Sequence, residues 1–215
     1  MKKIVLVGIK HTEMLADQLR RVIHTEKPKA ICLEADNFTY RLATGKAGKE
    51  EIERYFSNLP KIYKIVSLFK IKAQKKSKVD RDWHIRVVKE ASDNLSLDVI
   101  PIDMDQLAVY QKIEDEMKFA EKLRLFFDTV INRSRKGGTE LREEFSKRYP
   151  TLKRYLIDER DIFMANRIID VMRRYDKVVA VVGNAHIEGI ERRIKANLTE
   201  KDILVVIDVN SLRSR

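Results

Sequence analysis

Two histidines, His11 and His186, each stand three positions after a glycine that closes an apolar run. The segments read Gly8-Ile9-Lys10-His11 and Gly183-Asn184-Ala185-His186. An imidazole can serve as a base, an acid or a metal ligand near neutral pH. Taken alone, either histidine is typical of a hydrogen-bonded loop residue. Because the pattern occurs twice among only four histidines, the pair favours a hydrolytic or metal-binding centre.

The elements that must position these histidines are short apolar runs rich in β-branched residues. Five such runs are bounded by charged or turn residues: Ile4 to Val7, Ala30 to Leu33, Val99 to Ile102, Val178 to Val182 and Ile203 to Ile207. Continuous apolar runs of this length indicate buried strands of a mostly parallel sheet. The intervening stretches have helical spacing, as at Leu15, Leu19 and Val22. The predicted fold class is therefore α/β, with helices flanking both faces of the sheet.

A long region between the third and fourth predicted strands, residues 103–177, is dense in charge and helix formers. We interpret it as a mainly helical insertion, with a break at Arg135-Lys136-Gly137-Gly138. Residues 48–74 also have helical spacing. We expect one domain over residues 1–215, in which these helices form a subdomain beside the sheet.

Further polar residues follow the predicted strands or open the helices that precede them. Since ligands of open α/β sheets bind at the carboxyl ends of the strands, we expect these residues at one edge. Glu34 and Glu159 are candidate catalytic carboxylates beside the two histidines. The candidate substrate-binding residues are Lys10, Arg41, Arg160, Asp103 and Asp105. His84 is expected at the same edge, and helix capping is an equal alternative for Asp105, Asp158 and Asp161.

Five blocks of the chain occur in a recognisable order. They are Val7–His11, Pro28–Asp36, Ile102–Asp105, Asp158–Ala165 and Val181–Ile190. Together they resemble the motifs of the TraB/PrgY pheromone-shutdown family over nearly the whole chain. That family is similar to the Tiki proteases and, more distantly, to erythromycin-esterase-like and ChaN-like proteins with an α/β fold.

The resemblance implies a site built from the two histidines and nearby acidic residues, matched here by His11, His186, Glu34 and Glu159. In Tiki-like proteins it implies metal-dependent peptide hydrolysis. The leading expectation is a TraB-like hydrolase of the metallopeptidase kind, with Mn, Co or Zn held by His11 and His186. The alternative is a non-catalytic regulator of the pheromone-shutdown type, which would bind a peptide or small anion through basic clamps.

Three features depart from the pattern of the family. Lys10 occupies a usually small position, and its charge beside His11 opposes a metal ion. Met104 replaces the arginine that commonly separates the two aspartates. We expect no membrane-spanning tail of the kind that many relatives have, which favours a soluble role. The expected partner is a peptide or small-molecule ligand, and self-association is left open.

Composition narrows the remaining classes of function. The net charge is +11, and residues 61–89 contribute +8 of it, from ten Lys or Arg against two Asp. Such charge favours anionic partners, but the aromatic residues of that segment, Tyr63, Phe69 and Trp83, have core-like helical spacing, so nucleic acid is not an expected partner. The single cysteine, Cys32, excludes an intramolecular disulfide. The opening apolar run stops at Gly8 and no later run could span a bilayer, which predicts a cytoplasmic chain.

Overall fold

The computed structural model describes residues 1–10, 15–73, 82–130 and 145–212. His11 and the predicted break at residues 135–138 therefore lie outside the described residues. The chain forms two compact units, each assembled from segments distant in sequence. The sheet unit comprises residues 1–47, 79–104 and 160–215, and the helical unit comprises residues 48–78 and 105–159. The expectation that the whole chain acts as one domain stays a prediction.

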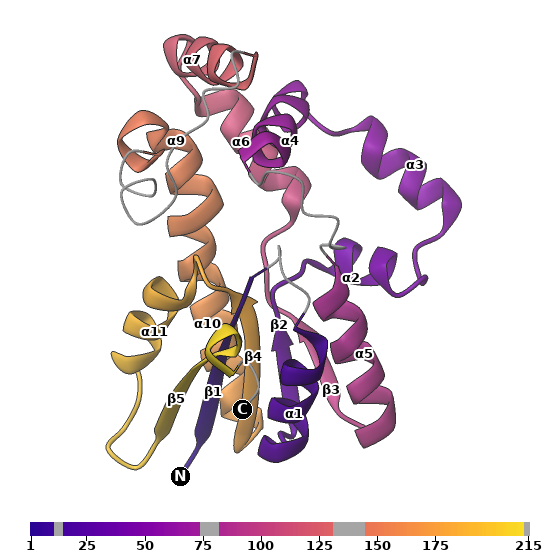
Figure 1. Ribbon diagram of the computed structural model, residues 1–215, viewed down its shortest axis with the longest axis vertical. Coiled ribbons are helices and arrows are strands. Elements are labelled where there is room, and N and C mark those ends of the chain that lie inside the picture. The colour runs from indigo at the N-terminus through magenta and orange to yellow at the C-terminus, as the bar shows by residue number, and fades with distance from the viewer. Residues whose placement is uncertain (11–14, 74–81, 131–144, 213–215) are drawn as a thin grey trace. The chain divides into compact units, whose positions relative to one another are not determined.

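The sheet has five parallel strands in the order β3-β2-β4-β1-β5 (Figure 1). They are β1 (Lys3–Ile9), β2 (Ala30–Leu33), β3 (Asp98–Pro101), β4 (Lys177–Gly183) and β5 (Ile203–Asp208). The predicted α/β class is thus confirmed, and each strand coincides with one of the five apolar runs. β1, β2 and β4 are inner strands buried on both faces, which is why they lack an alternation of polar and apolar residues.

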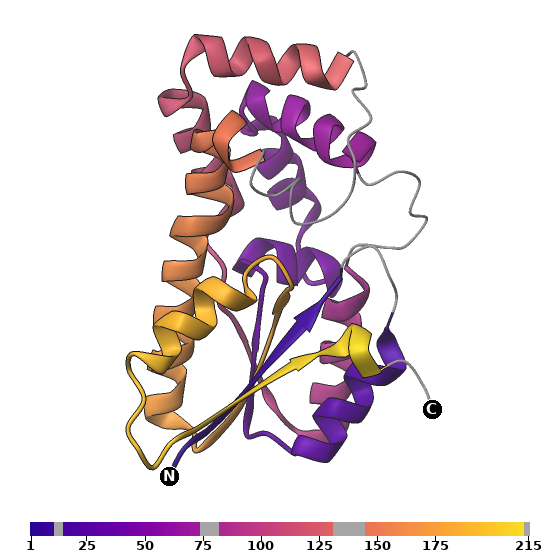
Figure 2. The same cartoon turned by 60° about the vertical axis from the view of Figure 1, so that its left-hand side comes forward.

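Helices cover both faces of the sheet, as predicted (Figure 2). On one side, α1 (Ala16–Glu26) and α5 (Trp83–Leu95) pack on alternate strand residues such as Val5, Val179 and Val181. On the other side, α10 (Glu159–Arg174) and α11 (Ile187–Lys195) pack on the intervening residues, such as Ile4 and Leu6. The period of two along each strand produces these two separate cores.

Two short helices complete the sheet unit. They are α2 (Asn37–Ala43), capped by the Asp36 carboxylate, which accepts from the Thr39 amide, and the 3₁₀ turn η2 (Val209–Leu212). α1 is closed by Lys27, the residue after its end, which adopts a left-handed φ of 44° directly before Pro28. The helix therefore ends there, and the chain continues into β2.

The helical unit contains α3 (Lys49–Ser57), α4 (Lys61–Ala73), α6 (Gln106–Glu116), α7 (Phe119–Val130) and α9 (Pro150–Lys153), followed by a π-helical turn, η1 (Arg154–Asp158). α4 packs against α6 and α7, and the Tyr63 and Tyr110 rings meet edge to face at 4.9 Å. No helix among the described residues is both long enough and apolar enough to cross a membrane.

The basic segment at residues 61–89 is divided between the two units. Tyr63 packs inside the helical unit, whereas Trp83 is buried in the sheet unit. Both rings thus have partners within the protein, and the expectation that nucleic acid is not a partner stays a prediction. Residues 74–81 of this segment lie outside the described ranges.

Candidate functional site at the carboxyl edge of the sheet

The two Gly-x-x-His segments leave adjacent strands. β1 and β4 are hydrogen-bonded neighbours, and Ile9 lies opposite Gly183 in the register. The amide of Asn184 donates to the Ile9 carbonyl at 2.9 Å, so the pairing continues one residue beyond the end of β4. Both segments therefore start at the same edge, although His11 itself is not among the described residues.

Gly8 is needed for close approach between these segments. A Cβ atom at this position would lie 2.4 Å from Oδ1 of Asn184 and 3.1 Å from Cγ1 of Ile187. Gly8 is still within β1, so its role is not to turn the chain. It lets the loop after β4 lie directly on the end of β1.

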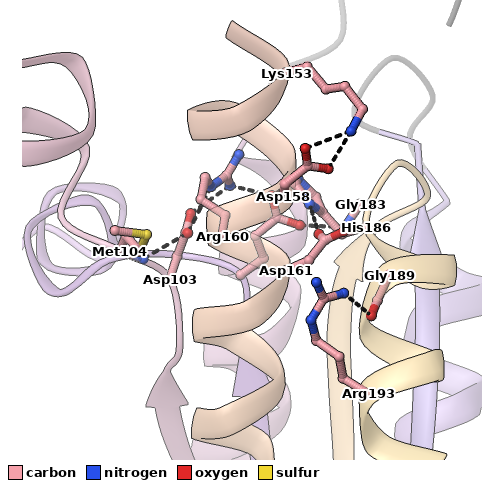
Figure 3. Close-up of polar contacts among 11 residues, drawn as sticks. Asp103, Met104, Lys153, Asp158, Arg160, Asp161, Gly183, His186, Gly189 and Arg193 are labelled. Atoms are coloured by element: carbon pink, nitrogen blue, oxygen red, sulfur yellow. Dashed lines mark hydrogen bonds and ion pairs between the residues drawn. The ribbon is translucent and has the colours of Figure 1, made fainter. Parts of the chain in front are cut away.

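Glu34 follows β2 and joins three elements at this edge. Its Oε2 accepts from the Gly183 amide at 2.5 Å, and its Oε1 accepts from a terminal nitrogen of Arg160 at 2.7 Å. Arg160 also forms a two-pronged contact with Asp103, at 2.9 Å from Nε and 2.6 Å from the terminal nitrogen (Figure 3). Met104 donates its amide to the same aspartate at 2.8 Å. One guanidinium thus connects carboxylates from the ends of β2 and β3.

His186 lies between two carboxylates. Its Nδ1 is 2.6 Å from Oδ1 of Asp161 (Figure 3), and its Nε2 is 3.4 Å from Oε1 of Glu34. All three side chains are more than nine-tenths buried. Since a carboxylate can only accept, the contact with Asp161 assigns the proton to Nδ1 and directs Nε2 toward Glu34.

Asp161 can reach His186 only because α11 has a glycine at this level. A Cβ atom on Gly189 would lie 1.9 Å from Oδ2 of Asp161 and 2.7 Å from its Cγ. Arg193 donates to the Gly189 carbonyl at 2.8 Å and so adds a contact at the same turn. Glycine costs about 1 kcal/mol relative to alanine inside a helix, and here the close packing of Asp161 explains its presence.

The electrostatic environment of Arg160 is dominated by its partners. Burial by itself would lower the pKa of this guanidinium, but the charges of Asp103 and Glu34 and their hydrogen bonds raise it above its ordinary value. Two carboxylates, Asp103 and Glu34, therefore contact one permanent cation, and a third carboxylate, Asp161, contacts His186. With a neutral imidazole, the three carboxylates and Arg160 together have a net charge of −2, which attracts a cation.

Three other predicted site residues, Lys10, Arg41 and Asp105, are exposed. Lys10 is exposed, and Arg41 is an exposed residue of α2 that donates to the Lys46 carbonyl at 3.4 Å. Asp105 caps α6 by accepting from the Ala108 amide at 2.9 Å.

Glu159 pairs with residues of the helical unit. Its carboxylate is 2.9 Å from Nε of Arg154 and 3.8 Å from Nζ of Lys112. Residues five apart face the same way on a π-helical turn, so η1 aligns Arg154 with Glu159. The structure thus brings Glu34, Arg160, Asp103 and His186 together and gives Glu159 other partners.

Asp158, Asp161 and His84 have different surroundings in the structure. Asp158 accepts both of its contacts from Lys153, at 2.8 and 2.6 Å (Figure 3). Asp161 does not cap a helix, because the chain is helical from Pro150 through Arg174 and residue 161 is interior. His84 is buried within α5.

The described part of the chain has no group of three or more His, Cys, Asp or Glu side chains arranged to hold a metal ion. Two potential donors do face each other there, Nε2 of His186 and Oε1 of Glu34. The other predicted metal ligand, His11, lies outside the described residues.

The fold and this cluster define an open, parallel α/β protein with a buried His–carboxylate–Arg cluster at the carboxyl edge of β2 and β4. A profile of the TraB/PrgY/gumN family matches residues 71–206, and the chain belongs to this family. The resemblance drawn from the five sequence blocks is thereby confirmed. An uncharacterized protein of Methanocaldococcus jannaschii is 25% identical over 231 aligned positions, which cover 96% of this chain and 57% of that protein. The chain thus spans little more than half the length of this relative.

Proposed function

We propose that the protein is a hydrolase in which His186 is the central reactive group. The observation that supports this proposal is the orientation of the imidazole, with Asp161 at Nδ1 and Nε2 directed toward Glu34. A carboxylate that fixes the proton on one ring nitrogen leaves the other nitrogen as a base or a ligand. The arrangement lies at the sheet edge where α/β proteins bind ligands.

Nε2 of His186 and Oε1 of Glu34 are too far apart for a good direct hydrogen bond. At 3.4 Å their separation is longer than a good N–H···O hydrogen bond of about 2.7–3.2 Å. With the proton on Nδ1, a lone pair of Nε2 would face a carboxylate oxygen, which is repulsive. A proton, a water molecule or a cation between the two atoms would relieve that repulsion.

The donor set is compatible with the divalent ion that the family resemblance implies. Nitrogen and oxygen donors lie about 2.0–2.2 Å from Zn²⁺, so two donors of one ion stand roughly 3 Å apart, near the separation of Nε2 and Oε1. Asp161 would then be the carboxylate that orients the ligating ring. When bound, such an ion supplies Lewis acidity and lowers the pKa of water. Arg160 weakens the attraction of Glu34 for a metal ion, because it donates to the same Glu34 oxygen. A third ligand would have to be His11 or another group.

The roles of the remaining residues follow from their contacts. Arg160 and the Gly183 amide hold the two oxygens of Glu34, which keeps that carboxylate facing His186. Asp103 holds the guanidinium from the other side. Glu34 orients water or ligand at Nε2, and Asp161 stabilises an imidazolium when His186 accepts a proton.

A non-catalytic, anion-binding function has less support from this geometry. It would use Arg160 as a clamp for a carboxylate or phosphate, but that guanidinium already donates to Asp103 and Glu34. Binding an anion there would require breaking contacts between buried charges, which costs several kcal/mol.

The test is hydrolysis of a peptide mixture by the purified protein with added Mn²⁺, Co²⁺ or Zn²⁺, together with its metal content. His186→Gln should lower turnover at least about 100-fold, in the range of a lost general base. His24→Gln is the matched control, since His24 is exposed in the last turn of α1. If His11 and His186 act as a unit, the double variant should be little worse than either single variant.

Two results would contradict the proposal. One is no hydrolysis with any of the three metals, combined with saturable peptide binding that survives His186→Gln. The other is an equal loss of turnover in His186→Gln and His24→Gln, which would assign the loss to a general effect on the protein.

A further inference from the structure

α7 exposes apolar side chains and buries polar ones. Five residues of this helix are large, apolar and 44–79% exposed: Phe119 79%, Leu123 44%, Phe126 49%, Phe127 49% and Val130 56%. They recur at positions i, i+4, i+7, i+8 and i+11, which at 100° per residue lie on one side of a helix. We call these five residues the α7 stripe. An exposed apolar patch of this kind marks an interaction surface.

The orientation of α7 is fixed by the polar residues on its inner side. Buried Glu121 accepts from the amide and hydroxyl of Thr151, at 3.1 and 2.7 Å. Asp128 accepts from Arg148 at 2.5 and 2.7 Å, and the Tyr149 hydroxyl contacts the same carboxylate. Rotating the helix to bury the stripe would break these contacts, so its exposure belongs to the folded helical unit.

The basic residues of α7 and the lysine directly before it border the α7 stripe. Lys118 and Lys122 border one side of it and Arg124 borders the other. The two acidic residues of the helix, Glu121 and Asp128, are those held on the inner side. The outward side of α7 therefore combines phenylalanine with Lys and Arg and presents no exposed carboxylate of its own.

We propose that the α7 stripe docks on the surface of a bilayer that contains anionic lipid. An interfacial helix has a phenylalanine- and leucine-rich side bordered by Lys and Arg, with the apolar side chains entering the acyl boundary. α7 has 12 residues and is about 18 Å long, too short to cross the hydrocarbon, so it lies in the interface plane. A second copy of the chain fits less well, because it would bring the like-charged borders of two stripes together.

The test is flotation of the 215-residue chain with vesicles of phosphatidylcholine alone or with about 30% phosphatidylglycerol. The wild type should bind the anionic vesicles about 30- to 150-fold more tightly, the ratio expected for two or three cations at about 1 kcal/mol each, and added salt should reduce the difference. Phe126→Glu should weaken binding about tenfold or more, and Lys118→Glu should weaken binding to anionic vesicles only. The matched control is Phe56→Glu, because Phe56 is 51% exposed on α3 of the same unit but outside the stripe.

A conservative variant keeps the proposal testable if a glutamate perturbs the fold. Phe126→Trp should show a blue shift with anionic vesicles and quenching by brominated lipid, beyond the signal of the buried Trp83. No preference for anionic vesicles, or an equal effect of Phe56→Glu, would overturn the proposal. A dimer in lipid-free solution that Phe126→Glu dissociates would also overturn it, by identifying a second copy as the occupant.

Discussion

Removing Arg160 should strongly destabilise the sheet unit, because its two partners cannot reach bulk water. The exposed fractions of the side chains are 11% for Arg160, 8% for Glu34 and 3% for Asp103. Removing one partner of a buried ion pair costs about 3–5 kcal/mol. Arg160→Met keeps an unbranched apolar stem and leaves two buried carboxylates without their cation, so we expect the upper half of that range.

Fluorescence of Trp83 can measure this loss during urea unfolding. It is the single tryptophan of the chain and is buried in the core of the sheet unit. A loss of about 4 kcal/mol moves the midpoint by about 2 M urea for a slope of about 2 kcal/mol/M. Arg20→Met is the matched control, because Arg20 also contacts two carboxylates, Asp17 and Glu90, but on the surface. Solvent screening should keep its effect within about 1 kcal/mol.

A double-mutant cycle separates the ion pair from packing. If the charges are coupled, Arg160→Met combined with Asp103→Asn should cost less than the sum of the two single variants, by at least about 1–2 kcal/mol. An effect of Arg160→Met no larger than that of Arg20→Met would refute the assignment of a buried, mutually dependent cluster.

Three further predictions concern single groups. Gly189→Ala should displace Asp161 and shift the ring resonances of His186 in NMR spectra. It should also not show the stabilisation of about 1 kcal/mol that alanine gives a helix relative to glycine. The control is Gly48→Ala, where a Cβ meets nothing within 4 Å, and which should leave those resonances in place. Burial raises the pKa of the Cys32 thiol to about 12, so the native protein should not react with Ellman's reagent at pH 8, whereas the urea-unfolded chain should react with one equivalent. Burial opposes ionisation of Glu26, but hydrogen bonds and charge from Lys3 and Lys177 outweigh burial and lower its pKa from the ordinary value of a glutamate. Glu26→Gln should therefore cost about 1 kcal/mol at pH 7, a difference that disappears as the pH falls through the native pKa, as measured by urea unfolding at pH 7 and pH 3.

The sheet, and the edge of it at which polar residues gather, could be predicted from the sequence. Runs such as Val178–Val182 read directly as buried parallel strands because both of their faces are covered. Strand direction then places Glu34 after β2 and Arg160 at the start of the antiparallel helix α10, and these two side chains do meet.

The partners of individual side chains were less predictable. Glu159 and Arg160 are neighbours in sequence, yet the π-helical turn directs Glu159 toward Arg154, and nothing in the local composition signals such a turn. Asp161 was open to a capping role because an aspartate near an expected helix start has that explanation. The available signal was Gly189, a glycine inside an expected helix, which indicates a close approach by another group.

The order of the strands has a consequence for how a nascent chain folds. β1 pairs only with β4 and β5, both of which lie near the other end of the sequence, and β2 and β1 share no hydrogen bonds. At about 5–20 residues per second, synthesis leaves β1 without a partner for roughly 10–30 s. Throughout that interval an entirely apolar segment, Ile4 to Val7, is available for intermolecular pairing. Yield in a host cell should therefore depend on translation rate and on chaperones that hold the nascent chain, more than on the stability of the finished sheet.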